Sequence, residues 1–368
     1  MPTKAAAHIP TNSTNPVVNA AQPLPDSFFF PRFPVPPRTN RPPQPASNQP
    51  NDRKPAMPPR LRPVPRITRL ARLARLYSTA SEPLIRVTNI PAPSSGHIRV
   101  LELNRPQARN AISKALLSAL RAQVDDLHAQ YGPGGRETGA LTPGLPAELG
   151  PTRALVLASA VDACFCAGAD LKERRGFTQQ ETADFLTSLR ETFASLASLQ
   201  IPSISAVSSL ALGGGLELAL STHFRVLTSN ATVGLPETRL GIIPGAGGTA
   251  RLPAIIGVSR ARDLILTGRR VVAPEAYFLG LADRLVEVEP DATDILQVAR
   301  KSALAEAVRL AHEICEGGPV AIRAGLQAVA WATQDKEDEM YERVVATEDR
   351  NEALKAFQEK RKPVFKGR

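Results

Sequence analysis

Two glutamates occupy apolar, glycine-rich stretches of this sequence. Glu217 follows the glycines 213–215 among leucines, and Glu237 lies 20 positions later, after Gly-Leu-Pro. A carboxyl group in apolar surroundings has a raised pKa and can exchange protons near neutral pH. We expect one helix and one strand between the two, so that both could reach one cleft and divide acid and base roles. For Glu217 alone, a first-turn glutamate that complements a helix dipole is an equal explanation.

Backbone N–H groups near these glutamates could bind a negatively charged oxygen. The glycines 213–215 run into an expected helix, whose N-terminus has unpaired N–H groups and partial positive charge. The small-residue turn Cys166-Ala-Gly-Ala-Asp170 follows a short apolar run and leaves N–H groups accessible to a ligand. Taken alone, this segment is better explained as a tight turn that needs Gly168, so it indicates a site only together with the glutamates.

Two other patterns predict no chemistry. The run Gly245-Ala-Gly-Gly-Thr-Ala250 fits the dinucleotide pattern G-x-G-x-x-A, but Pro244 stands where a strand should end. No strand that ends in an acid follows some 20 residues later, so we do not expect NAD binding. Cys164 and Cys166 have no Cys or His partners at ligand spacing, and we expect them to be buried reduced thiols.

Alternating strand and helix patterns predict an α/β fold from residue 83 onward. The expected strands are 98–103, 154–158, 204–207 and 224–227, and the expected helices are 113–130, 178–199, 300–313, 319–333 and 335–358. We expect a core over 81–290 and a helical region over 291–368. The Gly- and Pro-rich segment 131–151 interrupts the core and is expected to be an inserted surface loop without site chemistry.

The charge of the chain is concentrated near its N-terminus. Residues 1–80 contain 12 of the 45 Lys and Arg, two of the 35 Asp and Glu and 18 of the 34 Pro, so the other 288 residues carry 33 charges of each sign. The net charge of +10 therefore does not indicate a basic nucleic-acid-binding fold. The proline-rich part up to about residue 60 is expected to be disordered. No stretch approaches the roughly 20 apolar residues of a membrane helix, so we expect no membrane insertion.

An arginine-striped segment follows this proline-rich part. Arginine recurs every third residue over 66–75, with leucine or isoleucine at the same interval and no acid before Glu82. An amphipathic, Arg-rich and acid-poor helix is typical of a mitochondrial transit peptide, and we predict import into the matrix; a nucleic-acid-binding arm is the alternative. Because such signals normally begin a protein, we hypothesise that translation starts, at least partly, at Met57.

Several motifs together resemble the enoyl-CoA hydratase/isomerase (crotonase) superfamily. They are Asn104–Pro106, Cys166–Glu173, Ala211–Ala219, Leu235–Leu240, Ile243–Thr249 and Ala356–Arg361. The resemblance covers nearly all of 83–368. It implies an α/β fold built as a spiral of ββα turns, with a C-terminal helical trimerisation region, and homotrimers that often pair as dimers of trimers.

The resemblance also implies roles for single residues. The N–H groups of Ala169 and Gly214 would form an oxyanion hole for a thioester carbonyl, and Glu217 and Glu237 would be the two hydratase glutamates. The residues implied in coenzyme A binding are Ala167, Ala169, Asp170, Leu171 and Lys172, with Tyr341 and Lys360 offered by a neighbouring subunit. No metal and no separate cofactor are expected, because coenzyme A is part of the acyl-CoA substrate.

The retention of both glutamates favours hydration of an enoyl-CoA over double-bond isomerisation. The phrases 168–174, 210–220 and 237–244 are most similar to family members that hydrate 3-methylglutaconyl-CoA to 3-hydroxy-3-methylglutaryl-CoA in leucine breakdown. A general short-chain hydratase of fatty-acid β-oxidation is the alternative. The distal carboxylate of 3-methylglutaconyl-CoA would need a cation, for which Arg109 is a candidate; a solvated loop arginine explains it equally well.

RNA binding is a different kind of function for this fold. Some similar proteins bind AU-rich RNA through a lysine-rich first helix. The corresponding segment here, 113–126, has two basic and two acidic residues. Because the positive patch is missing, we do not expect RNA binding.

Overall fold

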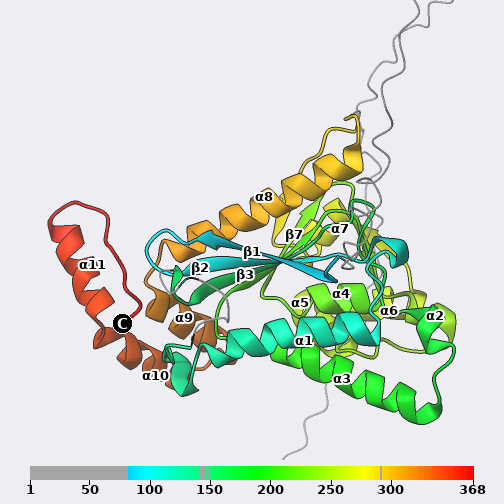
Figure 1. Cartoon of the computed structure of the whole chain (residues 1–368), viewed down its shortest axis with the longest axis horizontal. Helices are drawn as coiled ribbons and strands as arrows, with labels where there is room; N and C mark the ends of the chain where they lie inside the picture. The colour runs from blue at the N-terminus through cyan, green and yellow to red at the C-terminus, as the bar shows by residue number, and fades with distance from the viewer. Residues whose placement is uncertain (1–81, 141–145, 147–148, 291) are drawn as a thin grey trace, which may run out of the picture. The chain divides into compact units, whose positions relative to one another are not determined.

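The computed structural model describes residues 82–140, 146, 149–290 and 292–368 (Figure 1). The proline-rich segment, the arginine stripe and Met57 lie outside the described residues. Among the helices of the described part, none is both long enough and apolar enough to cross a membrane.

Successive turns of the chain add one strand to each of two sheets. The strands β3 (Thr152–Ser159), β5 (Ser203–Val207) and β7 (Phe224–Thr228) are parallel neighbours in one sheet. The strands that follow them, β4 (Cys164–Cys166), β6 (Leu210–Leu212) and β8 (Thr232–Gly234), are parallel neighbours in the other. Helices follow β4 and β6, so the predicted ββα spiral is confirmed.

Four further strands complete the sheets. The six-stranded sheet has the order β1-β2-β3-β5-β7-β10, and the four-stranded sheet has the order β4-β6-β8-β9. The added strands are β1 (Ile85–Pro91), β2 (His97–Leu103), β9 (Arg270–Val272) and β10 (Arg284–Val286). β1 and β9 pair antiparallel with their neighbours and the other pairs are parallel.

Two long helices of the core begin at N-capping residues. Ser113 caps α1 (Lys114–Ala129) by accepting a hydrogen bond from the N–H of Leu116. Thr178 and Glu181 form the predicted capping box of α3 (Gln179–Ala197). The shorter helices of the core are α2 (Leu171–Arg174), α4 (Gly214–Ala219), η4 (Pro236–Leu240), α5 (Gly248–Ile256), α6 (Val258–Thr267) and α7 (Ala273–Phe278).

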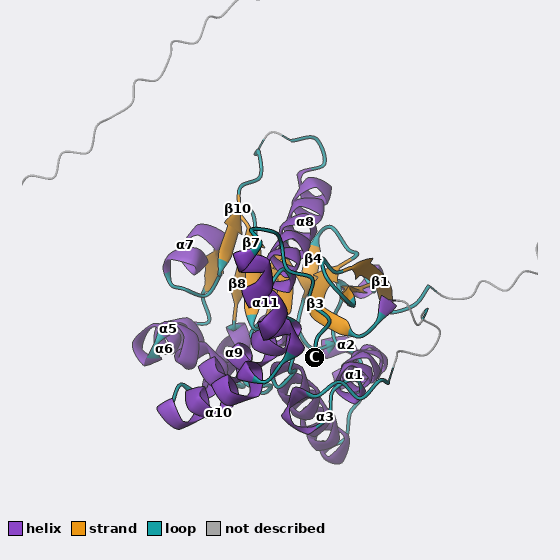
Figure 2. Ribbon diagram, turned by 90° about the vertical axis from the view of Figure 1, so that its left-hand side faces the viewer, coloured by secondary structure: helices purple, strands orange, loops and turns teal. Residues whose placement is uncertain are grey.

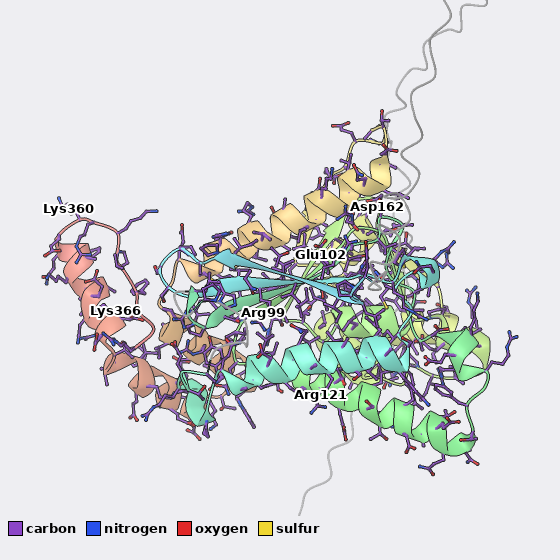
Figure 3. The ribbon with its side chains drawn as sticks, viewed as in Figure 1. Arg99, Glu102, Arg121, Asp162, Lys360 and Lys366 are labelled. Carbon is purple, nitrogen blue, oxygen red and sulfur yellow. The ribbon has the colours of Figure 1, made fainter. Side chains whose placement is uncertain are left out.

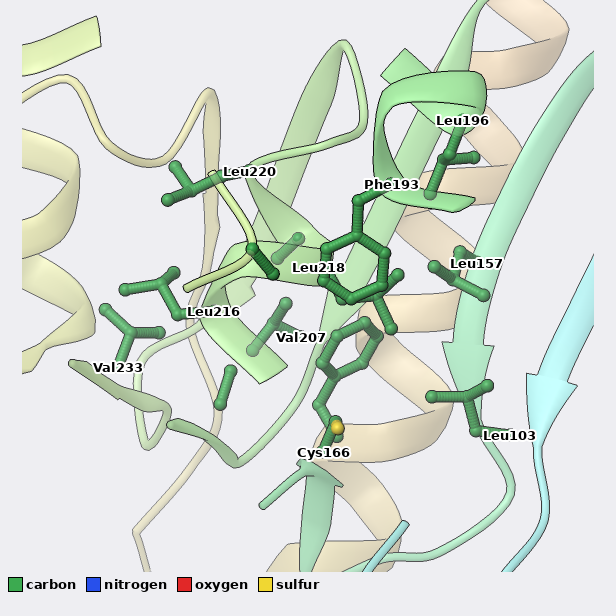
Figure 4. Close-up of a cluster of buried hydrophobic side chains, with 14 of the residues drawn as sticks. Leu103, Leu157, Cys166, Phe193, Leu196, Val207, Leu216, Leu218, Leu220 and Val233 are labelled. Atoms are coloured by element: carbon green, nitrogen blue, oxygen red, sulfur yellow. The ribbon is translucent and has the colours of Figure 1, made fainter. Parts of the chain in front are cut away.

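Two hydrophobic clusters lie against the six-stranded sheet. The larger one joins strands to α1, α3 and α4, with Phe193, Leu157 and Leu218 among its buried side chains (Figure 4). The smaller one joins β2, β3, β5 and β7 to α8 (Ile295–Cys315), whose small side chains Ala303, Ala307 and Ala311 lie on the sheet. Although α8 falls in the expected C-terminal helical region, it is packed as a layer of the core.

Ion pairs connect the same sheet to the helices on either side (Figure 3). Arg99 of β2 is fully buried and pairs with Asp126 of α1. Arg300 of α8 pairs with Glu102 of β2, at 3.5 Å, and with Asp162. Because the side chain of Arg99 is fully buried, removal of Asp126 would leave an uncompensated charge in the interior.

The C-terminal helices are α9 (Pro319–Trp331), α10 (Gln334–Val345) and α11 (Glu348–Gln358), which face the viewer in Figure 2. The prediction of a single helix over 335–358 is wrong, because the structure has two helices there, α10 and α11. Thr347 separates them with extended backbone and caps α11 by accepting a hydrogen bond from the N–H of Arg350.

In the inserted segment, the described residues 131–140 are anchored to the rest of the fold. Glu137 pairs with Arg153 of β3 and, at 3.4 Å, with Arg323 of α9. Arg323 also lies over the ring of Tyr131, 5.0 Å from its centroid. These contacts tie the insertion to both the sheet and the C-terminal helices.

Candidate active site

The carboxyl ends of β4, β6 and β8 lie side by side and carry the predicted site residues. Ala167–Ala169 follow β4, Gly213 and Gly214 follow β6, and Leu235 precedes η4 after β8. The N–H of Gly213 donates to the carbonyl of Gly234 at 2.9 Å, which extends the pairing of β6 and β8 to the edge. Parallel strands therefore bring together segments that are far apart in the sequence.

The N–H of Ala169 is left free by the pairing on either side of it. The N–H of Ile112 donates to the carbonyl of Gly168 at 2.8 Å, and the N–H of Asp170 donates to the carbonyl of Ile112 at 3.0 Å. Ala169 lies between these two bonds, and its own N–H donates to none of the described residues. The side chain of Arg105 supports the turn by donating to Asp170 at 2.7 Å.

The N–H of Gly214 is the second free donor. Gly214 is the first residue of α4, where the helix itself offers no acceptor, and no other described residue accepts from its N–H. A Cβ placed on Gly214 would lie 3.5 Å from the nitrogen of Ala169, so the two donors are neighbours. Two adjacent N–H groups that face a cavity can bind one oxyanion.

Glycine is required at two positions beside these donors. Gly168 has φ of +96°, and a Cβ there would lie 2.8 Å from the carbonyl oxygen of Leu212. Gly213 has φ of +53°, and a Cβ there would lie 2.9 Å from Oε1 of Glu237. These side-chain-free positions allow the turns and Glu237 to approach each other.

Glu217 is buried in the first turn of α4, with 2% of its surface exposed. Its Oε1 accepts hydrogen bonds from the N–H of Ala246, at 2.7 Å, and of Gly248, at 2.8 Å. Burial raises the pKa of Glu217, whereas the two N–H donors and the charges of Arg251 and Arg190 oppose that rise. One carboxylate oxygen is thus fixed and the other is left for a ligand or water.

Glu237 lies in η4 and is also buried, but its carboxyl group has fewer hydrogen bonds than that of Glu217. Its Oε2 has no hydrogen-bond partner among the described residues. Burial, together with the charge of Glu217, raises the pKa of Glu237 to about 7. At neutral pH this carboxyl group is therefore poised between its protonated and ionised forms.

A cavity of about 660 Å³ contains both glutamates and both free donors. Of the residues predicted to bind coenzyme A, Ala167 and Leu171 also line it, as does Ala169. Asp170 and Lys172 do not: Asp170 caps α2 by accepting from the N–H groups of Lys172 and Glu173.

Three other predicted residues lie away from this cavity. Tyr341 is exposed on α10, and Lys360 lies just after α11, at the opposite end of the view in Figure 3 from α2. Arg109 is exposed and is absent from the cavity wall, and its backbone carbonyl accepts from the N–H of Ala167. The structure therefore does not place Arg109 among the residues that line this cavity.

Some functional groups were not anticipated from the sequence. The N–H groups of Ala246 and Gly248 hold Glu217, so the glycine run that mimics a dinucleotide motif supports a carboxylate instead. Arg174 and Arg190 line the cavity as well. The glycine run was the available signal for the N–H donors, whereas nothing in the spacing distinguishes these two arginines from surface ones.

The cysteines next to the site are structural. Cys164 and Cys166 are free and buried, which confirms the expectation of reduced thiols. Burial raises the pKa of Cys164 to about 11 and that of Cys166 to about 12, so neither is a thiolate at neutral pH.

An enzyme that acts on acyl thioesters needs N–H donors for an oxyanion and groups that exchange protons, and one cavity of this ββα spiral holds two adjacent N–H donors and two buried carboxyl groups. The sequence model of the family described as Enoyl-CoA hydratase/isomerase matches residues 150–368. The chain belongs to this family, and it is an enoyl-CoA hydratase.

Individual relatives have more specific names than the family does. The chain is 64% identical to methylglutaconyl-CoA hydratase 1, mitochondrial, of Pyricularia oryzae, over 84% of this chain and 96% of that one. It is 37% identical to the mouse methylglutaconyl-CoA hydratase, mitochondrial, over 78% and 85%. The crystal structure of an enoyl-CoA hydratase from Bacillus anthracis superposes with a TM-score of 0.65 and 35% identity, covering 78% of this chain and all of that one.

Proposed function

We propose that this protein hydrates 3-methylglutaconyl-CoA to 3-hydroxy-3-methylglutaryl-CoA through Glu217 and Glu237. The observation that carries the proposal is the cavity that holds both carboxyl groups beside the N–H groups of Ala169 and Gly214. The names of the fungal and mouse relatives support the choice of acyl group.

The two N–H donors stabilise the transition state. Attack of water on Cβ moves negative charge onto the thioester oxygen, which lies between the N–H groups of Ala169 and Gly214 in this mechanism. Donors that are already oriented pay no reorganisation cost as the charge develops, and each contributes about 3 to 4 kcal/mol in comparable sites.

The environments of the two glutamates assign their roles. Glu217 receives two backbone hydrogen bonds that favour its ionised form, so it orients the water and takes its proton. Glu237, whose pKa is raised to about 7, holds the proton that goes to Cα. After the reaction the proton count of the pair is unchanged, because one proton has entered and one has left.

Replacement of each glutamate tests this mechanism. Glu217→Gln and Glu237→Gln should each lose most hydration of 3-methylglutaconyl-CoA while the fold, followed by circular dichroism, is kept. Glu191→Gln, at an exposed position of α3 outside the cavity, is the matched control. Near-normal turnover by either site variant would remove that glutamate from the mechanism.

Coenzyme A contacts and assembly belong to the same proposal. The C-terminal helices expose large apolar side chains, among them Trp331 (66%), Tyr341 (70%) and Phe357 (84%). Such a surface on a stable protein favours a partner, and we infer a homotrimer, or a dimer of trimers, in which Tyr341 and Lys360 reach a neighbour's coenzyme A. Light scattering that finds only monomers would refute this assembly.

Import into the mitochondrial matrix completes the proposal. Both methylglutaconyl-CoA hydratases compared above are named mitochondrial, which agrees with the arginine-striped segment over 66–75. Import into isolated mitochondria, followed by protease protection and N-terminal sequencing, should find a matrix protein that begins near Ser78. A full-length protein left outside the organelle would contradict it.

A further inference from the structure

Two arginines stand on the wall of the active-site cavity. Apart from the two glutamates, Arg174 and Arg190 are the charged residues among those that line it. Arg174 is the last residue of α2, and Arg190 lies on α3, one helical turn after the lining residue Leu186. Both therefore face the cavity that also contains the two glutamates and the two free N–H donors.

Neither arginine is paired with a carboxylate of the described residues. Nε of Arg190 donates to the carbonyl oxygen of Gly245 at 2.7 Å, which leaves its terminal nitrogens available. The side chain of Arg174 is half-buried and donates to no described residue. Arginines that serve the fold of this chain, such as Arg99, Arg153 and Arg300, do have carboxylate partners.

The backbone contact of Arg190 fixes where its charge lies relative to the chemistry. Gly245 is next to Ala246, whose N–H holds Oε1 of Glu217. The charge of Arg190 also acts on Glu217 and lowers its pKa, though less than the two backbone donors do. Arg190 is thus close to the glutamate that activates water, while the thioester carbonyl is held at Ala169 and Gly214.

We propose that Arg174 and Arg190 bind a carboxylate at the free end of the acyl group, so that the enzyme prefers acid-ended enoyl-CoA thioesters over neutral ones. A guanidinium can donate two parallel hydrogen bonds to a carboxylate, and the pairing strengthens as the acyl group displaces water from the cavity. In this proposal they supply the cation for which the sequence suggests Arg109, a residue that does not line the cavity. The inference rests on the proposed hydratase function.

The test compares two substrates in matched variants. kcat/KM is measured with 3-methylglutaconyl-CoA and with crotonyl-CoA, which lacks the second carboxylate, for wild type, Arg174→Gln, Arg190→Gln and the double variant. Arg175→Gln removes the same charge from the adjacent exposed residue, which does not line the cavity, and is the control.

We expect the ratio of the two kcat/KM values to fall about ten- to a hundredfold in the double variant, with smaller falls in the single ones, and to stay unchanged in Arg175→Gln. The ratio is the decisive quantity because Arg190 also contacts Gly245, next to the residue that holds Glu217. Loss of Arg190 can therefore lower the turnover of both substrates, and the ratio cancels that shared effect. Equal losses for both substrates in the double variant would overturn the inference, as would a wild type that prefers crotonyl-CoA.

A binding measurement separates this inference from the hydratase proposal. Glutaryl-CoA and pentanoyl-CoA have acyl chains of equal length and differ in the terminal carboxylate, and neither can be hydrated. Calorimetry should find tighter binding of glutaryl-CoA to wild type and a loss of that preference in the double variant. If the enzyme hydrates neither enoyl-CoA but keeps this preference, the hydratase proposal fails alone; equal binding of both by wild type overturns the carboxylate site.

Discussion

Because the pKa of Glu237 is raised, we predict that the fold is less stable at and above neutral pH, where this carboxyl group has to ionise, than in weak acid. In the unfolded chain this carboxyl group titrates near 4.5, whereas in the folded protein its pKa is about 7. Well below pH 4.5 both states hold the proton, so the ionisation of Glu237 does not change the free energy of unfolding. As pH rises toward 7, the unfolded state ionises first, and the free energy of unfolding falls until the folded state has also lost its proton.

The size of this effect follows from the shift. A rise from 4.5 to about 7 corresponds to about 3 kcal/mol at 1.36 kcal/mol per pKa unit. Most of it, about 2.5 kcal/mol, should appear between pH 5 and pH 8. Glutamine cannot ionise, so the free energy of unfolding of Glu237→Gln should not show this loss. From pH 5 to pH 8 it should therefore fall by about 2.5 kcal/mol less in Glu237→Gln than in wild type.

Urea unfolding at pH 5 and pH 8 measures this difference. Any constant cost of burying the amide cancels, because each protein is compared with itself at two pH values. Protein concentration has to be held fixed, since assembly also contributes to stability. Glu191→Gln, at an exposed site, should follow wild type. A Glu237→Gln variant with the same pH dependence as wild type would show that Glu237 is not buried as an acid, and the division of roles between the glutamates would lose its basis.

Three further predictions concern the same site. First, kcat/KM for hydration should fall about tenfold per pH unit above pH 7, and kcat/KM for the reverse dehydration should show the same pH profile. The reason is that the glutamate pair has to hold one proton in either direction. A profile that stays flat to pH 9 would contradict Glu237 as the acid. Gly213→Ala should cost about 1 to 3 kcal/mol of stability and lower kcat at least tenfold, because its Cβ would press on Glu237, whereas Gly139→Ala, which has a similar φ but no atom within 4 Å, should lose stability alone. Cys164 and Cys166 should resist a thiol reagent at pH 8 until the protein is unfolded, and rapid labelling of the native protein would refute their burial.

Local sequence signals predicted the elements well where the signal was itself local. The capping box at Thr178 and the apolar spacing that follows it fixed where α3 begins, because the cap and its partner are three residues apart. At Thr347 a similar N-cap interrupts a helix that the apolar spacing alone predicts to be continuous. The packing of α8 on the sheet was not evident either, since its alanines look alike whether they cover a sheet or a neighbouring helix.

The sequence by itself predicted which residues could carry the chemistry: two glutamates in apolar surroundings and two glycine-rich turns that leave N–H groups free. The tertiary structure decided what those residues can do. Glu217 is held by N–H groups 29 and 31 residues away, and the pKa of Glu237 rises because other segments bury it. It also decided which arginines line the cavity, since Arg174 and Arg190 do and Arg109 does not. Residue type and spacing fix local conformation, whereas burial, electrostatics and distance between remote segments exist only once the parallel strands have brought their ends together.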